Sequence, residues 1–403
     1  MQIKAALNAI TENINIFAAE QLSRLDHSRA KALRLPGKVA YFQGGSAYHR
    51  VAVVCPLEGE LDHEQQLVAG LIWANKVSNG QKTVLYLVGT KFSSVVSHLI
   101  QFFGHQIEVR LAYYSPRLST PFLIAGREAK ALPPRYLTSL PRDQGYWERT
   151  FNPVEKGWFV AALDYFRSLR EKGMAIWFLD NWVSIRFRGL EIVRISKKES
   201  RLRIALITRC PREVAGSVGT REEKEGWINA QGLLNGEFIR AFEQRLTQLT
   251  GDKELFARVC QEKYHLEYLI RSKLNEWGLD DKVFCQLDVG YKGETELLVD
   301  MLCRNEYGNL VIISAHPQKD LFGFVHCLEQ LVWSKLQFAE IKRIYFDNQF
   351  LAEPETWLVC PKNRIHPDIE ILRSLLLPER KIKLLSINDD WSESGITCGK
   401  WIG

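Results

Sequence analysis

Glu267 and Asp300 are two of the 47 acidic residues of this chain, and their carboxylates could contribute to a divalent-metal site. Asp300 lies within an apolar run at 298–302, and Glu267 lies upstream in a segment with helical spacing. Carboxylate oxygens suit hard divalent ions such as magnesium, which polarise a phosphate and activate water. Two carboxylates alone make a poor magnesium site, so the neighbouring elements decide whether this chemistry is available.

The segments that must position these acids alternate between helices and strands. Apolar runs, turn residues and helical spacing define them. In chain order, the predicted elements are a helical segment at 265–270 within a longer helix, strands at 297–302 and 310–315, a helix at 322–337, a strand at 356–360, a helix at 367–377 and a strand at 382–387.

This order resembles the catalytic core of the PD-(D/E)xK nuclease superfamily, the restriction-endonuclease-like fold, in particular its RecB-like and NucS-like branches. The resemblance covers residues 262–387. In that superfamily one strand of a hairpin presents an aspartate and the next presents an acid-x-lysine, and together they hold divalent metal ions. The resemblance therefore implies a nucleic-acid partner.

The resemblance also assigns five vestigial catalytic positions. Asp300 stands at the place of the family's aspartate, Glu267 at the acidic position of the leading helix, and Gln330 at the glutamine of the following helix. Ser314 replaces the second acid and His316 replaces the lysine, which removes a charged ligand and a permanent cation. Glu267 and Asp300 are the candidate metal ligands that remain at the family's positions, so we expect no cofactor, and Mg²⁺ only if nuclease activity persists.

A second cluster of functional residue types lies in the segment 175–208, where apolar residues alternate with polar ones. We predict antiparallel strands that place basic and aromatic side chains on one face. Such a face could follow a phosphate backbone and stack on a base, or it could be the solvated outer face of a half-buried sheet. The candidate nucleic-acid-binding residues are Trp182, Arg186, Arg188, Arg201 and Arg203.

The patterns along the whole chain predict an α/β protein with several domains. We expect an α/β layer domain over 1–150, either Rossmann-like or a degenerate nuclease-like copy, and then a helix with a central antiparallel sheet over 151–210. A linker and helix over 211–252 precede a restriction-endonuclease-like α/β domain over 253–403.

Helical spacing elsewhere in the chain defines further helices. They are expected at 4–35, 62–78, 154–172, 229–249 and 252–276.

Composition limits the class of protein without naming an activity. The net charge of +6 permits a polyanionic partner but does not require one. The eight cysteines form no Cys-x-x-Cys pair and mostly lie in apolar runs, which indicates buried, reduced thiols and not a zinc site. No apolar run reaches the ~18 residues that a membrane span requires, so we expect a cytoplasmic protein that does not contact membranes.

Three functional hypotheses follow. The first is a noncatalytic nucleic-acid-binding protein with a degenerate nuclease fold, with DNA favoured over RNA as its partner. The second is an active metal-dependent nuclease with a rearranged site. The third is a scaffold or interaction protein that binds no nucleic acid. Self-association into a homo-oligomer stays open under all three.

Overall fold

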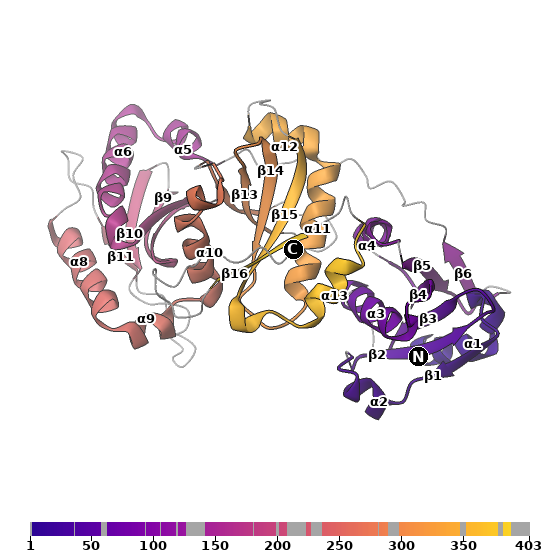
Figure 1. Ribbon diagram of the computed structural model, residues 1–403. Coiled ribbons are helices and arrows are strands. Elements are labelled where there is room, and N and C mark those ends of the chain that lie inside the picture. The colour runs from indigo at the N-terminus through magenta and orange to yellow at the C-terminus, as the bar shows by residue number, and fades with distance from the viewer. Residues whose placement is uncertain are drawn as a thin grey trace. The chain divides into compact units, whose positions relative to one another are not determined.

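Three separate β-sheets organise the part of the chain that the computed structural model describes (Figure 1). The predicted α/β class is confirmed, since helices accompany each sheet. The described residues are 2–35, 37–57, 63–92, 94–104, 106–117, 120–125, 142–179, 181–198, 201–207, 223–226, 236–280, 282–288, 298–346, 352–377 and 382–387.

The first sheet has six strands in chain order. They are β1 (Gln21–Arg24), β2 (Val39–Gly45), β3 (Arg50–Pro56), β4 (Thr83–Gly89), β5 (Ile107–Tyr114) and β6 (Phe122–Ala125). Strands β3, β4 and β5 are parallel, whereas β1, β2 and β6 join the sheet in the antiparallel sense. The central parallel strands are buried on both faces, which explains their continuous apolar sequences.

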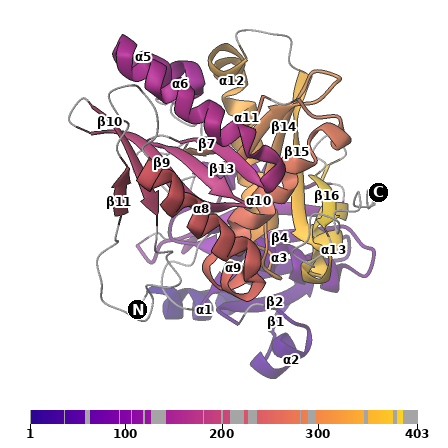
Figure 2. The same cartoon turned by 90° about the vertical axis from the view of Figure 1, so that its left-hand side faces the viewer.

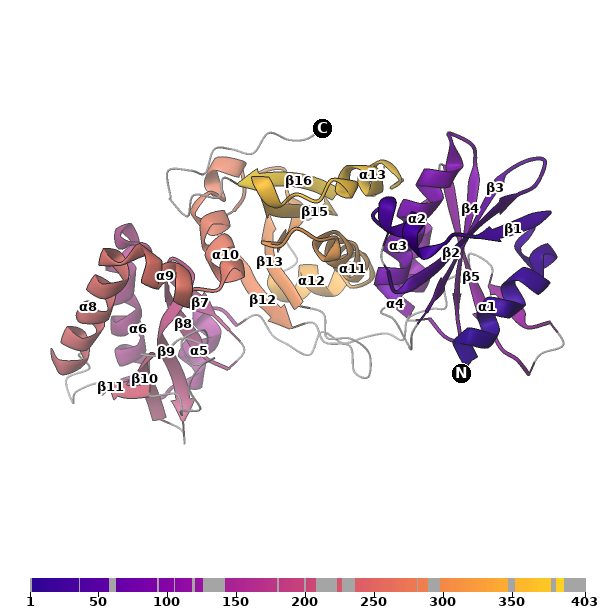
Figure 3. The same cartoon turned by 90° about the horizontal axis from the view of Figure 1, so that it is seen from below.

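Helices cover both faces of the first sheet (Figure 3). The helix α1 (Gln2–Glu12) contributes Ala6 and Ile10 to an apolar cluster with alternate residues of β3, and α3 (His63–Ser78) packs on the opposite face. The amide of Gln66 in α3 is buried and donates to the carbonyl oxygen of Val54 at 3.2 Å. The predicted helix at 62–78 is confirmed.

The segment 4–35, predicted as one helix, is divided among four elements, so that prediction is wrong. They are α1, the 3-10 turn η1 (Ile14–Phe17), β1 and α2 (His27–Ala32). Ala18 adopts a left-handed φ of 52° and ends η1. Strand β1 then pairs with β2, with Gln21 opposite Gly45, because pairing with a sheet edge outweighs a local helical pattern.

The second sheet is antiparallel throughout and has the order β11-β10-β9-β8-β7. Its strands are β7 (Met174–Phe178), β8 (Val183–Phe187), β9 (Leu190–Lys198), β10 (Arg201–Ile207) and β11 (Glu223–Gly226). Four of them confirm the period-two prediction. Strand β11 lies in the segment predicted as a linker, so the sheet extends further along the chain than the turn-rich sequence indicated.

Four helices supply one apolar core with the second sheet (Figure 2). Alternate residues Val183, Ile185 and Phe187 of β8 belong to this core, as does Phe242 of α8. The helices are α5 (Gln144–Thr150), α6 (Pro153–Ser168), α8 (Gly236–Gly251) and α9 (Lys253–Val259).

The third sheet contains the predicted hairpin. Strands β13 (Leu298–Arg304) and β14 (Asn309–Ala315) are antiparallel neighbours, and α11 (Phe322–Leu336) follows, as the sequence predicts. The parallel strand β15 (Ala352–Pro361) then pairs with β14. The remaining elements of this region are α10 (Glu262–Ser272), β12 (Phe284–Asp288), α12 (Phe338–Tyr345), α13 (Asp368–Ser374) and β16 (Ile382–Ile387).

Short elements complete the connections. They are α4 (Ser94–Leu99) and the 3-10 turns η2 (Ile100–Phe102), η3 (Arg170–Lys172), η4 (Asn275–Trp277) and η5 (Lys362–Arg364). Strand β12 and helix α12 were not predicted, and the predicted helix at 252–276 is divided between α9 and α10.

The chain forms two compact units. The first contains Met1–Tyr136, Lys319–Leu336 and Arg364–Lys383, so α11 and α13 cluster with the first sheet. Within this unit α11 packs on α4, and α13 packs on α3. The second unit contains Leu137–Gln318, Gln337–Asn363 and Leu384–Gly403.

Two composition-based predictions can be compared with the described residues. Six cysteines, at positions 55, 260, 285, 303, 327 and 360, are free and buried, as predicted. Cys210 and Cys398 lie outside the described residues. Across the described ranges, none of the helices has both the length and the apolar character needed to span a lipid bilayer.

The turn between β8 and β9 fixes the distance from the second sheet to α10. Gly189 has a φ of +95°, and a Cβ at this position would lie 2.2 Å from the carbonyl oxygen of Tyr264 in α10. We predict that Gly189→Ala costs roughly 3 kcal/mol, because both the left-handed backbone and a rigid helix backbone oppose the methyl group. The thermal unfolding midpoint measures this loss.

Gly278→Ala is the matched control in the same unit. Gly278 also has a positive φ of +70°, but the nearest atom to its Cβ belongs to the flexible Glu306 side chain at 3.2 Å. We expect a loss of only about 1 kcal/mol there. Equal losses in the two variants would contradict a close approach of the turn to α10.

Candidate functional site

Helix α10 carries two charged residues one turn apart, at the centre of the second unit. Lys263 and Glu267 have i,i+4 spacing and therefore lie on the same face of the helix. Glu267 is completely buried, whereas the Lys263 side chain is 34% exposed. The apolar residues of α10, including Leu266 and Ile270, belong to a core cluster with Met301 of β13.

Asp300 meets this face of α10 from strand β13. Its carboxylate is fully buried, and Lys263 Nζ lies 2.7 Å from Asp300 Oδ1. The backbone N–H of Ala315 donates to Asp300 Oδ2 at 2.9 Å, and the hydroxyl of Ser314 donates to the same oxygen at 3.5 Å. Both oxygens of the carboxylate therefore have partners within the protein.

A polar layer crosses the sheet at the level of Asp300. The pairs Cys285–Met301 and Met301–Ile313 set a register that places Gln286 of β12 and Ser314 of β14 on either side of Asp300. Gln286 has a left-handed φ of 51°, which is unusual for a residue with a side chain. Its amide nitrogen donates to Glu267 Oε2 at 3.1 Å.

Arg186 of β8 extends this layer to the second sheet. Its guanidinium donates to the amide oxygen of Gln286 at 3.3 Å and to the hydroxyl of Ser184 at 3.0 Å. The guanidinium carbon also lies 3.8 Å from the ring centroid of Trp177 and 4.5 Å from that of Tyr264. Such contacts favour a desolvated cation through the ring quadrupoles.

We call these five residues, Arg186, Lys263, Glu267, Gln286 and Asp300, the buried polar cluster.

Burial controls the charge of the buried polar cluster. Loss of solvent, together with the negative charge of Asp300, raises the pKa of Glu267 to about 8, against the opposing effects of Lys263 and Arg186. Burial would lower the pKa of Lys263, but Asp300 outweighs it and the pKa is raised. At neutral pH the cluster therefore contains a protonated Glu267 beside a Lys263–Asp300 ion pair.

A divalent metal does not fit this arrangement. Asp300 is already bonded to Lys263 and Ala315, and a protonated Glu267 is a weak ligand at neutral pH. Over the described part of the chain, no group of three or more His, Cys, Asp or Glu side chains could hold a metal ion.

The structure brings together three of the five nuclease-pattern residues: Glu267, Asp300 and Ser314. The backbone N–H of His316 donates to the carbonyl of Val359 at 2.9 Å. Gln330 is buried on α11 of the first unit, and its amide lies 2.8 Å from the ring nitrogen of His326.

Sequence reasoning missed Lys263 and Gln286. The cation that contacts Asp300 comes from α10 and not from the strand position of His316. The i,i+4 spacing of Lys263 and Glu267 was a signal that could have identified the lysine. Gln286 gave no such signal, because its role depends on a strand and a backbone conformation that the sequence did not predict.

The expected exposed arginine face needs correction. Arg186 is only 4% exposed, so the prediction that it lies on an outer face is wrong. The alternation itself is correct, but α10 covers the β7–β8 end of this face. Arg188 occupies the β8–β9 turn with a φ of 47°, and its carbonyl oxygen lies 2.8 Å from His265 Nδ1.

The other end of this face is less deeply buried, although the Arg194 side chain is only 13% exposed. Trp182 donates to Glu191 at 2.7 Å and lies under the guanidinium of Arg194, which also pairs with Glu191. Arg203 is half-buried on β10. The side chain of Arg201 lies outside the described residues.

Comparison with known proteins adds no assignment. Neither the models of protein families nor the curated protein sequences include a match to this chain.

The protonated state of Glu267 predicts a pH effect on stability. The pKa of Glu267 is about 8 in the folded chain, whereas the ordinary pKa of a glutamate carboxyl is 4.5. The folded chain therefore binds more protons than the unfolded chain between these values, and its stability falls as the pH rises through this window. Glu267→Gln cannot titrate. Its free energy of unfolding should therefore rise relative to that of the parent by up to ~1.4 kcal/mol per pH unit, which is measured as a rising difference between the two thermal midpoints.

Glu276→Gln provides the control, since Glu276 lies in the same unit and its side chain is 51% exposed. Its midpoint should follow that of the parent over the same pH range. A constant difference between Glu267→Gln and the parent would contradict a protonated Glu267.

Loss of the ion pair should be costly. Lys263→Met leaves the Asp300 carboxylate buried without its counter-ion, and we expect a loss of about 3 kcal/mol, measured as a lower thermal midpoint. Adding Asp300→Asn removes the uncompensated charge and should recover part of this loss. Lys273→Met, which disrupts a surface pair with Glu276, should cost less than ~1 kcal/mol. Additive effects of Lys263→Met and Asp300→Asn on stability would contradict an energetic coupling between Lys263 and Asp300.

Proposed function

We propose that this chain is a noncatalytic nucleic-acid-binding protein whose C-terminal elements have a degenerate restriction-endonuclease-like arrangement. One observation carries the proposal: an ion pair between the half-buried Lys263 and the buried Asp300 occupies the position where a nuclease of this pattern would present metal ligands. The order α10, β12, β13, β14, α11, α12, β15, α13, β16 supports the likeness in arrangement, with α12 as an additional helix. The protonated Glu267 supports the absence of hydrolysis at neutral pH.

The proposed nucleic-acid surface is the β9–β10 part of the second sheet, where the side chain of Arg194 is 13% exposed and Arg203 is half-buried. Arg194 of β9 pairs with Ala205, and Arg203 of β10 pairs with Ser196, so both arginines lie on the same face of adjacent strands. Guanidinium groups in this arrangement suit a row of phosphates. The net charge of +6 favours the same class of partner.

DNA is the favoured partner because the resemblance is to nucleases of the RecB-like and NucS-like branches. The proposal includes a cytoplasmic location, which agrees with free, buried thiols at the six described cysteines.

A metal-dependent nuclease with a rearranged site is the second candidate. The contact of Lys263 with Asp300 favours it, because it gives the site a lysine that His316 does not supply. This candidate requires an ionised Glu267, and therefore predicts cleavage that increases as the pH rises through about 8. The first candidate predicts no cleavage at any pH.

One set of measurements separates the candidates. We predict retardation of DNA in a gel-shift assay with and without magnesium or manganese, and no nicking of plasmid at pH 7 or pH 9. Binding should weaken steeply with salt, because each phosphate contact releases counterions. The double variant Arg194→Gln, Arg203→Gln should lower both the affinity and the slope of this salt dependence.

The matched control is Arg167→Gln with Arg343→Gln. Both arginines lie in the second unit and pair with an acid of their own helix, as Arg194 pairs with a nearby acid of its own strand. The control should bind as the parent does. Metal-dependent nicking that Asp300→Ala abolishes would establish the nuclease instead, and no retardation of DNA or RNA at low salt would support a scaffold role.

A further inference from the structure

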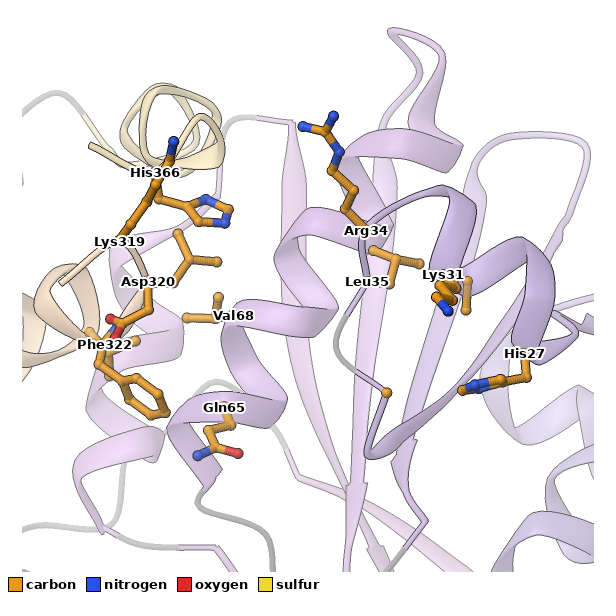
Figure 4. Close-up of a pocket in the computed structure, with 14 residues that line it drawn as sticks. His27, Lys31, Arg34, Leu35, Gln65, Val68, Lys319, Asp320, Phe322 and His366 are labelled. Carbon is orange, nitrogen blue, oxygen red and sulfur yellow. The ribbon is translucent and has the colours of Figure 1, made fainter. Parts of the chain in front are cut away.

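The first unit contains a pocket of about 640 Å³ that is separate from the buried polar cluster (Figure 4). It is formed by α2 and the segment after it, the first turns of α3, the start of α11 and the residue His366 before α13. A volume of this size lies within the ~300–1,000 Å³ that small-molecule sites usually have.

The floor of the pocket is apolar. Ala30, Leu35, Val68 and Val325 line it and are buried. The ring of Phe322 lies at its edge and is 51% exposed, which is unusual for a phenylalanine. This floor could cover the body of an apolar or aromatic ligand.

Basic side chains lie on two sides of this floor. His27, Lys31 and Arg34 come from α2 and the turn after it, and Lys319 and His366 lie across the pocket in Figure 4.

One acidic residue, Asp320, also lines the pocket. Its carboxylate accepts the backbone N–H of Phe322 at 2.8 Å, at the start of α11. The lining therefore contains more basic than acidic groups, which favours an anionic ligand.

His366 is influenced by charged residues from both sides of the pocket. Burial lowers the pKa of its imidazole, and the charges of Lys319 and Arg34 lower it further, against Asp368 and Asp320. The positive charges of Lys319 and Arg34, which lie on opposite sides of the pocket, therefore both influence His366.

Arg34 has an unfavourable backbone conformation for its side chain. It follows α2 with a left-handed φ of 55°, and the N–H of Leu35 donates to the carbonyl of Ala30 at 2.9 Å. Glycine usually occupies such a position after a helix. An arginine there weakens the turn, which points to a role for its guanidinium.

We propose that this pocket binds a small organic anion, with an apolar or aromatic body on the floor and a charged head between Arg34 and Lys319. This inference concerns the first unit and does not depend on nucleic-acid binding by the second.

The probe for the test is 8-anilinonaphthalene-1-sulfonate, an anionic aromatic molecule whose fluorescence increases in apolar surroundings. We expect saturable binding at one site of the full chain. Arg34→Gln should weaken it by roughly ten-fold, because the substitution removes a charge-assisted contact. Arg29→Gln, in the preceding helix α2 but outside the pocket, should leave the affinity unchanged.

Two further variants separate binding from folding. Arg34→Gly should keep or raise the thermal midpoint while it weakens binding of the probe. Val68→Trp should fill the apolar floor of the pocket and prevent binding of the probe. The uncharged analogue N-phenyl-1-naphthylamine should lose little affinity in Arg34→Gln. Non-saturable binding, equal effects of Arg29→Gln and Arg34→Gln, or full displacement by inorganic phosphate alone would overturn the proposal.

Discussion

The ion pair between the half-buried Lys263 and the fully buried Asp300 is the interaction on which the centre of the second unit depends. Removing a carboxylate from water is costly, and a single well-placed cation with one backbone hydrogen bond offsets that cost. The pair fixes α10 against β13. The hydrogen bonds from Arg186 through Gln286 to Glu267 then connect β8 and β12 to the same helix.

The ion pair also limits the chemistry of this region. Because Lys263 and Ala315 occupy the oxygens of Asp300, and burial keeps Glu267 protonated, few hard oxygen ligands remain. A site whose acids are protonated or already paired with a cation stabilises a fold more readily than it activates water. This physical reason places binding ahead of hydrolysis in the proposed function.

The first unit distributes its charges differently. Arg34, Lys31 and Lys319 surround an apolar floor and stay near solvent, where their charges can attract a ligand at little desolvation cost. In the second unit, by contrast, Arg186 is buried. Its guanidinium contacts the rings of Trp177 and Tyr264 and connects neighbouring elements. Similar residue types therefore serve binding in one place and packing in the other.

The sequence by itself determined the α/β class, the β13–β14 hairpin with α11, and strands β7 to β10, because local apolar periodicity sets these elements. It also identified Glu267, Asp300 and Ser314 as neighbours. Only the tertiary structure decided that Lys263 supplies the cation, that Gln286 reaches Glu267, and that Arg186 is buried. Each of these depends on which helix covers which face of a sheet, and contacts between distant segments leave no periodic signal in the chain.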